Sequence, residues 1–221
     1  MKKIPLNNKD MIAKLEKFFW LRDNKESVKL TCSDAEAEKY VSDEYLQTIL
    51  DMGKEHNGFP EVCKSWSFHY KTGNSSFDSN DPQKAVEWRN KFDEISHPMQ
   101  SDYNLRTNAL CVLYPPGGFI SWHNNANASA FNIIFTWSET GDGWFKYRDG
   151  NTGEIITIHD TPGWQVKMGY FGSYHEQKEN LCYHAAYTDC YRMTVSYVLD
   201  RSETSKQLQE WLIEDISAEE D

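Results

Sequence analysis

The second half of the chain alternates between short apolar runs and turn residues. From about residue 105, the runs are rich in aromatic and β-branched residues, which suit a pleated strand. They cover residues 110–114, 131–137, 144–148, 154–158, 164–168 and 191–199. Gly, Pro, Asn or Asp separates them, as in Pro115-Pro116-Gly117-Gly118. Many short strands divided by such turns favour an antiparallel sandwich or barrel.

The first half has the spacing of amphipathic helices. Apolar residues recur at helical intervals over residues 11–20 and from about 36 to 52, where Ser33 and Glu36 form a possible capping box. Asp81-Pro82 predicts the start of a third helix, because Pro suits the first helical position. That helix is expected to bury Val86, Trp88, Phe92 and Ile95. A last helix, about 203–214, carries Leu208, Trp211 and Leu212.

The pattern predicts one domain over residues 1–221, with an α+β fold and a mostly β core. Residues 1–104 supply N-terminal supporting helices, a first strand at 65–70 and an exposed loop at 73–81 that is a candidate lid. Residues 105–200 form the core. Residues 201–221 add the C-terminal helix and an acidic tail.

Composition narrows the classes of partner and compartment. The formal net charge of −11 argues against nucleic acid as a partner, since phosphate contacts need clustered Lys and Arg. No apolar run approaches the roughly 20 residues that span a bilayer, so no membrane partner is expected. The five cysteines contain no CxxC pair, which indicates reduced thiols. Without a recognisable secretory signal, the expected location is cytoplasmic.

Two of the seven histidines stand in a pattern that indicates a metal site. His123 ends the run that starts at Tyr114, His184 opens His-Ala-Ala, and Arg192 follows eight residues later. Antiparallel strands can bring two distant imidazoles to one Fe(II) ion, with positions left for an α-keto acid and dioxygen. The guanidinium of Arg192 would form a charge-assisted fork with the far carboxylate of that acid.

This spacing resembles the prolyl-4-hydroxylase-like branch of the Fe(II)/2-oxoglutarate dioxygenases, over roughly residues 105 to 200. In that family a Tyr and a Gly-Gly pair precede an HxD motif, matched by Tyr114, Gly117-Gly118 and His123. A later His-Ala-Ala is followed by a basic residue, matched by residues 184–186 and Arg192.

The resemblance implies a double-stranded β-helix (jelly roll) that uses Fe(II) and 2-oxoglutarate as cofactors. It implies that His123 and His184 bind the metal and that Arg192 binds 2-oxoglutarate. Tyr114, Thr194 and Asn132 are implied as further contacts of the cosubstrate. The substrate is expected to be a peptidyl side chain or a small metabolite, and no oligomeric state is predicted.

The sequence departs from the family at the third metal ligand. His123-Asn124-Asn125 places Asn125 where the HxD motif has aspartate, and no histidine in the chain has an acid two residues on. An amide is a neutral and weaker donor, so one negative charge is lost beside a dication. Asn125 then ligates weakly, or the site uses two histidines and a vacant position, or the pocket is not catalytic.

Two other functions remain open on the sequence. One is a non-catalytic jelly-roll binding module that has lost the metal carboxylate. The other is a cupin-like metalloenzyme that needs no keto acid, against which the offset of Arg192 argues. Lys146, Arg148 and Lys167 lie near the predicted strands, where they would either supply a basic pocket mouth or, as we expect, be solvated charges.

Overall fold

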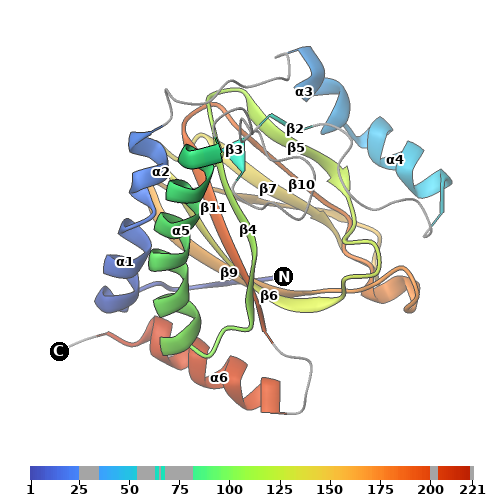
Figure 1. Cartoon of the computed structure of the whole chain (residues 1–221). Coiled ribbons are helices and arrows are strands. Elements are labelled where there is room, and N and C mark those ends of the chain that lie inside the picture. The colour runs from blue at the N-terminus through green and yellow to red at the C-terminus, as the bar shows by residue number, and fades with distance from the viewer. Residues whose placement is uncertain (25–34, 54–62, 65, 68–81, 200–203, 220–221) are drawn as a thin grey trace.

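Two antiparallel β-sheets lie face to face at the centre of the molecule (Figure 1). The computed structural model describes residues 1–24, 35–53, 63–64, 66–67, 82–199 and 204–219. One sheet has the order β1 (Lys2–Ile4), β9 (Gly163–Phe171), β6 (Ala130–Ser138), β11 (Arg192–Leu199), β4 (Thr107–Tyr114) and β3 (Trp66–Ser67). The other has the order β2 (Cys63–Lys64), β5 (Gly118–His123), β10 (His184–Thr188), β7 (Gly143–Arg148) and β8 (Ile155–His159).

The strand pairing confirms the prediction of a mostly β, antiparallel core. Every strand pair in the described residues is antiparallel. The six predicted runs correspond to β4, β6, β7, β8, β9 and β11, with ends that differ by a few residues. From β4 to β11 the chain changes sheet at nearly every connection, so residues far apart in sequence meet between the sheets.

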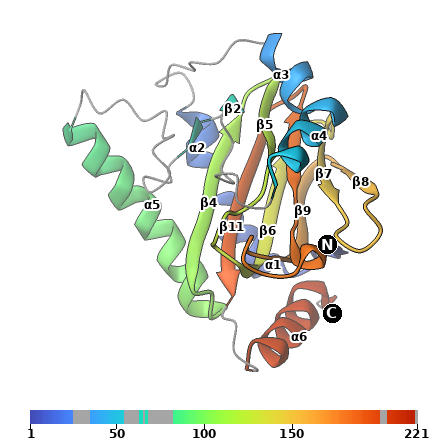
Figure 2. The same cartoon turned by 90° about the vertical axis from the view of Figure 1, so that its right-hand side faces the viewer.

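Helices cover the outer faces of the two sheets (Figure 2). The six-stranded sheet packs against α1 (Lys9–Glu16), α2 (Phe19–Asp23) and α5 (Pro82–Asp102) through one large apolar cluster. Residues of α6 (Thr204–Ser217) join the same cluster beside β1. The five-stranded sheet is covered by α3 (Ala35–Tyr40) and α4 (Asp43–Asp51). Among the described helices, none is long and apolar enough to cross a bilayer.

The predicted helices are present, with two of them divided. The expected helix over 11–20 is broken between α1 and α2, which turns Phe19 onto Trp137, with ring centroids 5.3 Å apart. The expected helix over 36–52 is broken before Ser42, whose hydroxyl accepts a hydrogen bond from the Tyr45 amide and caps α4. Tertiary packing and a local cap therefore override a continuous helical period.

The third helix begins at Pro82 as predicted, but its apolar face is narrower than expected. Trp88 and Ile95 are buried, whereas Val86 is 58% exposed, because the N-terminal turns of α5 extend past the edge of the sheet. Of the predicted strand 65–70, the structure describes only 66–67, which is β3. The candidate lid 73–81 lies outside the described residues.

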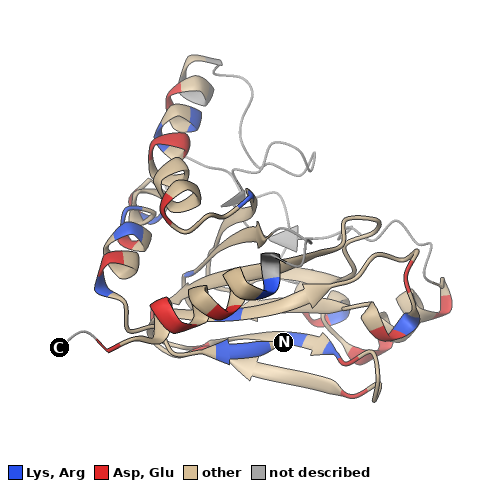
Figure 3. Ribbon diagram, turned by 90° about the horizontal axis from the view of Figure 1, so that it is seen from below, with Lys and Arg blue, Asp and Glu red and all other residues tan. Residues whose placement is uncertain are grey.

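The face of the six-stranded sheet that meets the other sheet is unusually polar. Residues alternate between faces along a strand, and the apolar cluster under the helices takes one set of them. The opposite set points between the sheets and includes Tyr114, Asn132, Thr136, Ser138, Gln165, Lys167, Arg192, Thr194 and Ser196, all buried. Figure 3 shows that charged residues are concentrated on the helices and are scarce on the strands. The few buried charges inside therefore need an explanation.

Candidate functional site

His123 and His184 stand side by side between the sheets. They end β5 and begin β10, and the antiparallel register places them directly opposite each other. Their ring centroids are 4.0 Å apart, with the ring planes tilted by 50°. The His184 ring also contacts Phe145 on β7 and Phe171 on β9, with centroids 5.7 and 4.8 Å away. The structure thus brings the two predicted metal ligands together.

Hydrogen bonds to the backbone fix the tautomer of both imidazoles. His123 Nδ1 lies 2.8 Å from the Ser121 carbonyl, and His184 Nδ1 lies 2.9 Å from the Cys182 carbonyl. A carbonyl oxygen only accepts, so each Nδ1 must carry the proton. The lone pair of each ring is then on Nε2, which is the usual arrangement of a metal-binding histidine.

Burial keeps the His184 imidazole neutral. Burial lowers the pKa of His184 well below its usual value, and the neighbouring His123 ring lowers that pKa further. His123 is buried, whereas His184 keeps a partly exposed edge. A neutral imidazole binds a metal through its free ring nitrogen, so His184 and the adjacent His123 suit a divalent metal.

The segment after β5 separates the roles of the two asparagines. Asn124 is fully buried, and its side-chain oxygen accepts a hydrogen bond from the Ala126 amide at 2.8 Å. Ala126 has φ +49°, a left-handed conformation that this side-chain bond supports. The Asn124 side chain therefore stabilises the turn and is not free to bind a metal. The amide that takes the place of the HxD aspartate is Asn125, two residues after His123. Among the described residues, no third His, Cys, Asp or Glu joins the pair.

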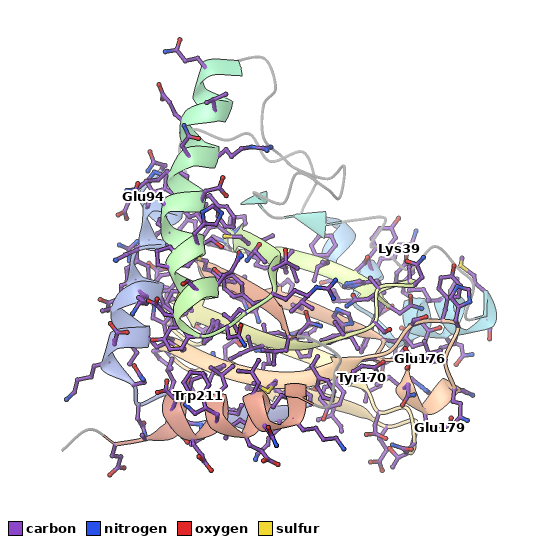
Figure 4. The ribbon with its side chains drawn as sticks, turned by 60° about the horizontal axis from the view of Figure 1, so that its bottom comes forward. Lys39, Glu94, Tyr170, Glu176, Glu179 and Trp211 are labelled. Carbon is purple, nitrogen blue, oxygen red and sulfur yellow. The ribbon has the colours of Figure 1, made fainter. Side chains whose placement is uncertain are left out.

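The loop between β9 and β10 stabilises the turn at residues 124–126 through a backbone hydrogen bond. The Tyr174 amide donates a hydrogen bond to the Ala126 carbonyl at 2.9 Å. Glu176 anchors the loop by accepting hydrogen bonds from the Tyr170 hydroxyl at 2.9 Å and the Ser173 amide at 3.1 Å (Figure 4). Burial alone would raise the pKa of Glu176, but these bonds and others outweigh it and lower that pKa.

We expect Glu176→Gln to lower the free energy of unfolding by about 1 kcal/mol at pH 7, because it weakens several charge-assisted hydrogen bonds. The folded-state pKa of Glu176 is depressed, so its contribution is present above the ordinary carboxyl pKa. It is lost as the pH falls below about 4. Urea unfolding at pH 7 and pH 3.5 measures both effects. Glu179→Gln, an exposed position in the same loop, is the control; equal losses in the two variants would contradict the anchoring role.

Arg192 lies at the other end of the interior with two of its three predicted companions. Its Nε donates to Asp160 Oδ2 at 2.6 Å, and its Nη1 donates to Thr194 Oγ1 at 2.9 Å. Its guanidinium lies 5.6 Å from the centroid of the Tyr114 ring. Asn132 lies apart, since it pairs with Val198, and its amide donates to the Ala130 carbonyl at 3.2 Å.

Asp160 was not predicted as a site residue, although its place is built into the fold. It follows β8, and its backbone amide donates to the Gly143 carbonyl at 2.9 Å. A Cβ at position 143 would lie only 2.7 Å from Asp160 Oδ2, so glycine is needed there to admit the carboxylate. The pair of Asp160 and Arg192 is almost completely shielded from solvent.

Lys167 corrects the expectation of a solvated strand charge. It is 1% exposed, and its Nζ donates to Thr136 Oγ1 at 3.1 Å and lies 5.2 Å from the Phe145 ring centroid. The polar residues of β9 face the second sheet, whereas Val166 and Met168 face the helices. Lys146 and Arg148 keep partial exposure, as neighbours in the outward set of β7.

The cysteines agree with the prediction of free thiols as far as the structure describes them. Cys111, Cys182 and Cys190 are unpaired and buried. Burial raises the pKa of Cys182 to about 12, which makes it an inert, apolar side chain.

Comparison with known proteins finds distant structural likenesses. No family model matches the chain, and no curated protein matches it. A prolyl-4-hydroxylase from Pseudomonas putida is 10% identical, with a TM-score of 0.33 over 82% of this chain and 98% of the hydroxylase. The ribosomal oxygenase YcfD from Escherichia coli is 14% identical, with a TM-score of 0.34 over 76% of this chain and 46% of that chain. The cupin domain of Schizosaccharomyces pombe Cnp3 is 10% identical, with a TM-score of 0.26 over 44% and 59%.

Proposed function

We propose that the protein is an Fe(II)- and 2-oxoglutarate-dependent oxygenase that hydroxylates a peptidyl side chain or a small metabolite. One observation carries the proposal: two imidazoles, with ring centroids 4.0 Å apart, have Nδ1 committed to backbone carbonyls and Nε2 left as the coordinating atom. The alternation of β4 to β11 between two sheets supports a double-stranded β-helix as the scaffold.

The chain's own residues divide the work as follows. His123 and His184 hold the metal, with Asn125 as a neutral donor at the third position. Arg192, with Tyr114 and Thr194, closes the end of the interior that faces away from the histidines. Asn132 lies on the same inward face of the six-stranded sheet but apart from Arg192. Any contact of Asn132 with 2-oxoglutarate would therefore be made away from the carboxylate that lies farthest from the metal. Bound Fe(II) would supply the activation of dioxygen coupled to decarboxylation of 2-oxoglutarate.

The test is succinate formation from 2-oxoglutarate with Fe(II) under air, with Mn(II) binding measured in parallel by calorimetry. We expect His123→Ala to weaken Mn(II) binding by roughly a hundredfold or more, since loss even of an outer-shell partner costs 10- to 100-fold. His97→Ala, an exposed histidine on α5, is the control and should bind as the wild type does. If the wild type forms no succinate and His123→Ala binds Mn(II) unchanged, the proposal is wrong.

One observation favours a second candidate, a non-catalytic binding module. No carboxylate completes the histidine pair among the described residues, so the charge that holds Fe(II) in the resembled family is absent. Anaerobic Fe(II) with 2-oxoglutarate separates the two functions. A visible charge-transfer band requires both to bind at one metal centre, and its absence, together with binding of an organic acid, would favour the module.

A further inference from the structure

Two polar side chains are paired directly behind the histidine pair. His123 ends β5 opposite His184, which begins β10, so the register places Asn124 opposite Tyr183. Neighbouring residues of an extended chain point to opposite faces, so this second pair lies on the side of the sheet away from the imidazoles. Asn124 and Tyr183 are 0% and 3% exposed. Their contact is therefore shielded from solvent.

A hydrogen bond joins the two side chains. Burial raises the pKa of Tyr183, and its hydrogen bond with the Asn124 side chain opposes that rise. A bond that favours the phenolate is one donated to the phenol oxygen, so the amide group of Asn124 is the donor.

Tyr183 is a fixed point of attachment for Asn124. Its ring belongs to the apolar cluster that the five-stranded sheet forms with α4. Its carbonyl accepts a hydrogen bond from the Arg148 amide at 2.9 Å, which joins it to the end of β7. The bond to Tyr183 thus ties the segment after His123 to the segment before His184.

The other end of the Asn124 amide shapes the backbone around Asn125. Asn124 Oδ1 accepts from the Ala126 amide at 2.8 Å, which closes a turn with Asn125 at its centre. The Asn125 carbonyl accepts from the Ala128 amide at 2.9 Å. The backbone of Asn125 is held on both sides, and this sets the direction in which its side chain leaves the turn.

We propose that Asn124 is a positioning residue, which holds the Asn125 amide at the third metal position by tying the turn to Tyr183. The inference rests on the proposed function, because that function assigns Asn125 to the metal. Asn124 itself does not touch the metal, since its oxygen is committed to Ala126 and its nitrogen to Tyr183. It acts through Asn125.

Mn(II) affinity, measured by calorimetry, tests this role. We expect Asn124→Ala to weaken Mn(II) binding by roughly tenfold, the lower end of the loss seen for outer-shell partners of a metal. Asn8→Ala is the matched control. Asn8 Oδ1 accepts from the Met11 amide at 2.8 Å, and its Nδ2 donates to Asp215 Oδ2 at 3.0 Å. This control loses the same two kinds of bond at the start of α1 and should bind Mn(II) as the wild type does.

The decisive measurement is the coupling between positions 124 and 125. Asn125→Asp is expected to tighten Mn(II) binding by at least about tenfold in the wild-type background, and by less than about twofold in Asn124→Ala. A purely structural role of Asn124 would lower the stability of both proteins and leave that gain unchanged.

Tyr183→Phe is the second variant should Asn124→Ala not fold. It keeps the buried ring and removes only the hydroxyl, so the turn keeps the Asn124 bond to Ala126 but loses its tie to the other strand. We expect it to weaken Mn(II) binding by roughly threefold and to reduce the gain from Asn125→Asp.

Succinate formation by the wild type separates this proposal from the oxygenase function. A gain that disappears with Asn124, in a protein that forms no succinate, supports the positioning role and removes the oxygenase. Equal gains in the two backgrounds, or Mn(II) binding unchanged by both Asn124→Ala and Tyr183→Phe, overturn the positioning role even if succinate is formed. A wild type that binds no Mn(II) overturns both.

Discussion

Asn125→Asp should tighten the binding of Mn(II) or Fe(II) by at least about tenfold. The substitution keeps the shape of the side chain and adds one negative charge at the third ligand position, where it would attract a dication. The free-energy change of about 1.4 kcal/mol per factor of ten is easily resolved by calorimetry under anaerobic conditions.

A control variant must separate the effect of the added charge from the effect of placing it at the third ligand position. Asn127→Asp places the same charge two residues further on, at an exposed site in the same turn, and should change the metal affinity little. Equal affinities in Asn125→Asp and the wild type would place the Asn125 side chain outside the coordination sphere. The site would then hold the metal through two histidines, with the remaining positions filled by exogenous ligands.

Arg192→Met should lower the free energy of unfolding by about 3–5 kcal/mol, because it leaves the Asp160 carboxylate buried without its cation. One oxygen of that carboxylate, Oδ1, already has no hydrogen-bond partner in the described residues, so Asp160 depends on Arg192 through Oδ2. Urea unfolding at pH 7 measures the loss.

A double variant tests the cause of this loss. Arg192→Met combined with Asp160→Asn removes both charges and should regain most of the stability, since the cost comes from the unpaired ion. A loss below about 1 kcal/mol in the single variant would mean that solvent reaches the pair. An equal loss in the double variant would assign the effect of Arg192 to packing.

The sequence was most informative where spacing and strand pairing act together. The offsets of Tyr114, His123, His184 and Arg192 predict them as site residues. Antiparallel pairing of β5 with β10 places His123 beside His184, and pairing of β4 with β11 places Tyr114 beside Arg192. The positions of the strands could also be predicted, because runs of aromatic and β-branched residues between turn residues favour strands over helices.

The local sequence pattern does not predict which polar residues are buried between the two sheets. Gln165 and Lys167 alternate with Trp164, Val166 and Met168, and this period predicts a strand with one face in solvent. Only the three-dimensional arrangement shows that β9 is covered on both faces. Asp160 likewise stands in a turn-like stretch, and its role depends on a contact with Arg192, 32 positions away in sequence.

The helical errors have a similar physical origin. Val86 fits the periodicity of α5 but lies where the helix has passed the sheet, so there is no surface for it to pack on. Helical period identifies a face, whereas the length over which that face is buried depends on the partner.

The position of β1 bears on how copies of this chain meet one another. Sheets tend to grow by adding a neighbour's strand to an open edge, and β9 would present such an edge if β1 did not pair with it. Residues Lys2 and Lys3 of β1 are exposed, whereas Ile4 is buried. The edge strand of this sheet, β1, therefore carries two exposed lysines, whose positive charges discourage strand-to-strand association between molecules.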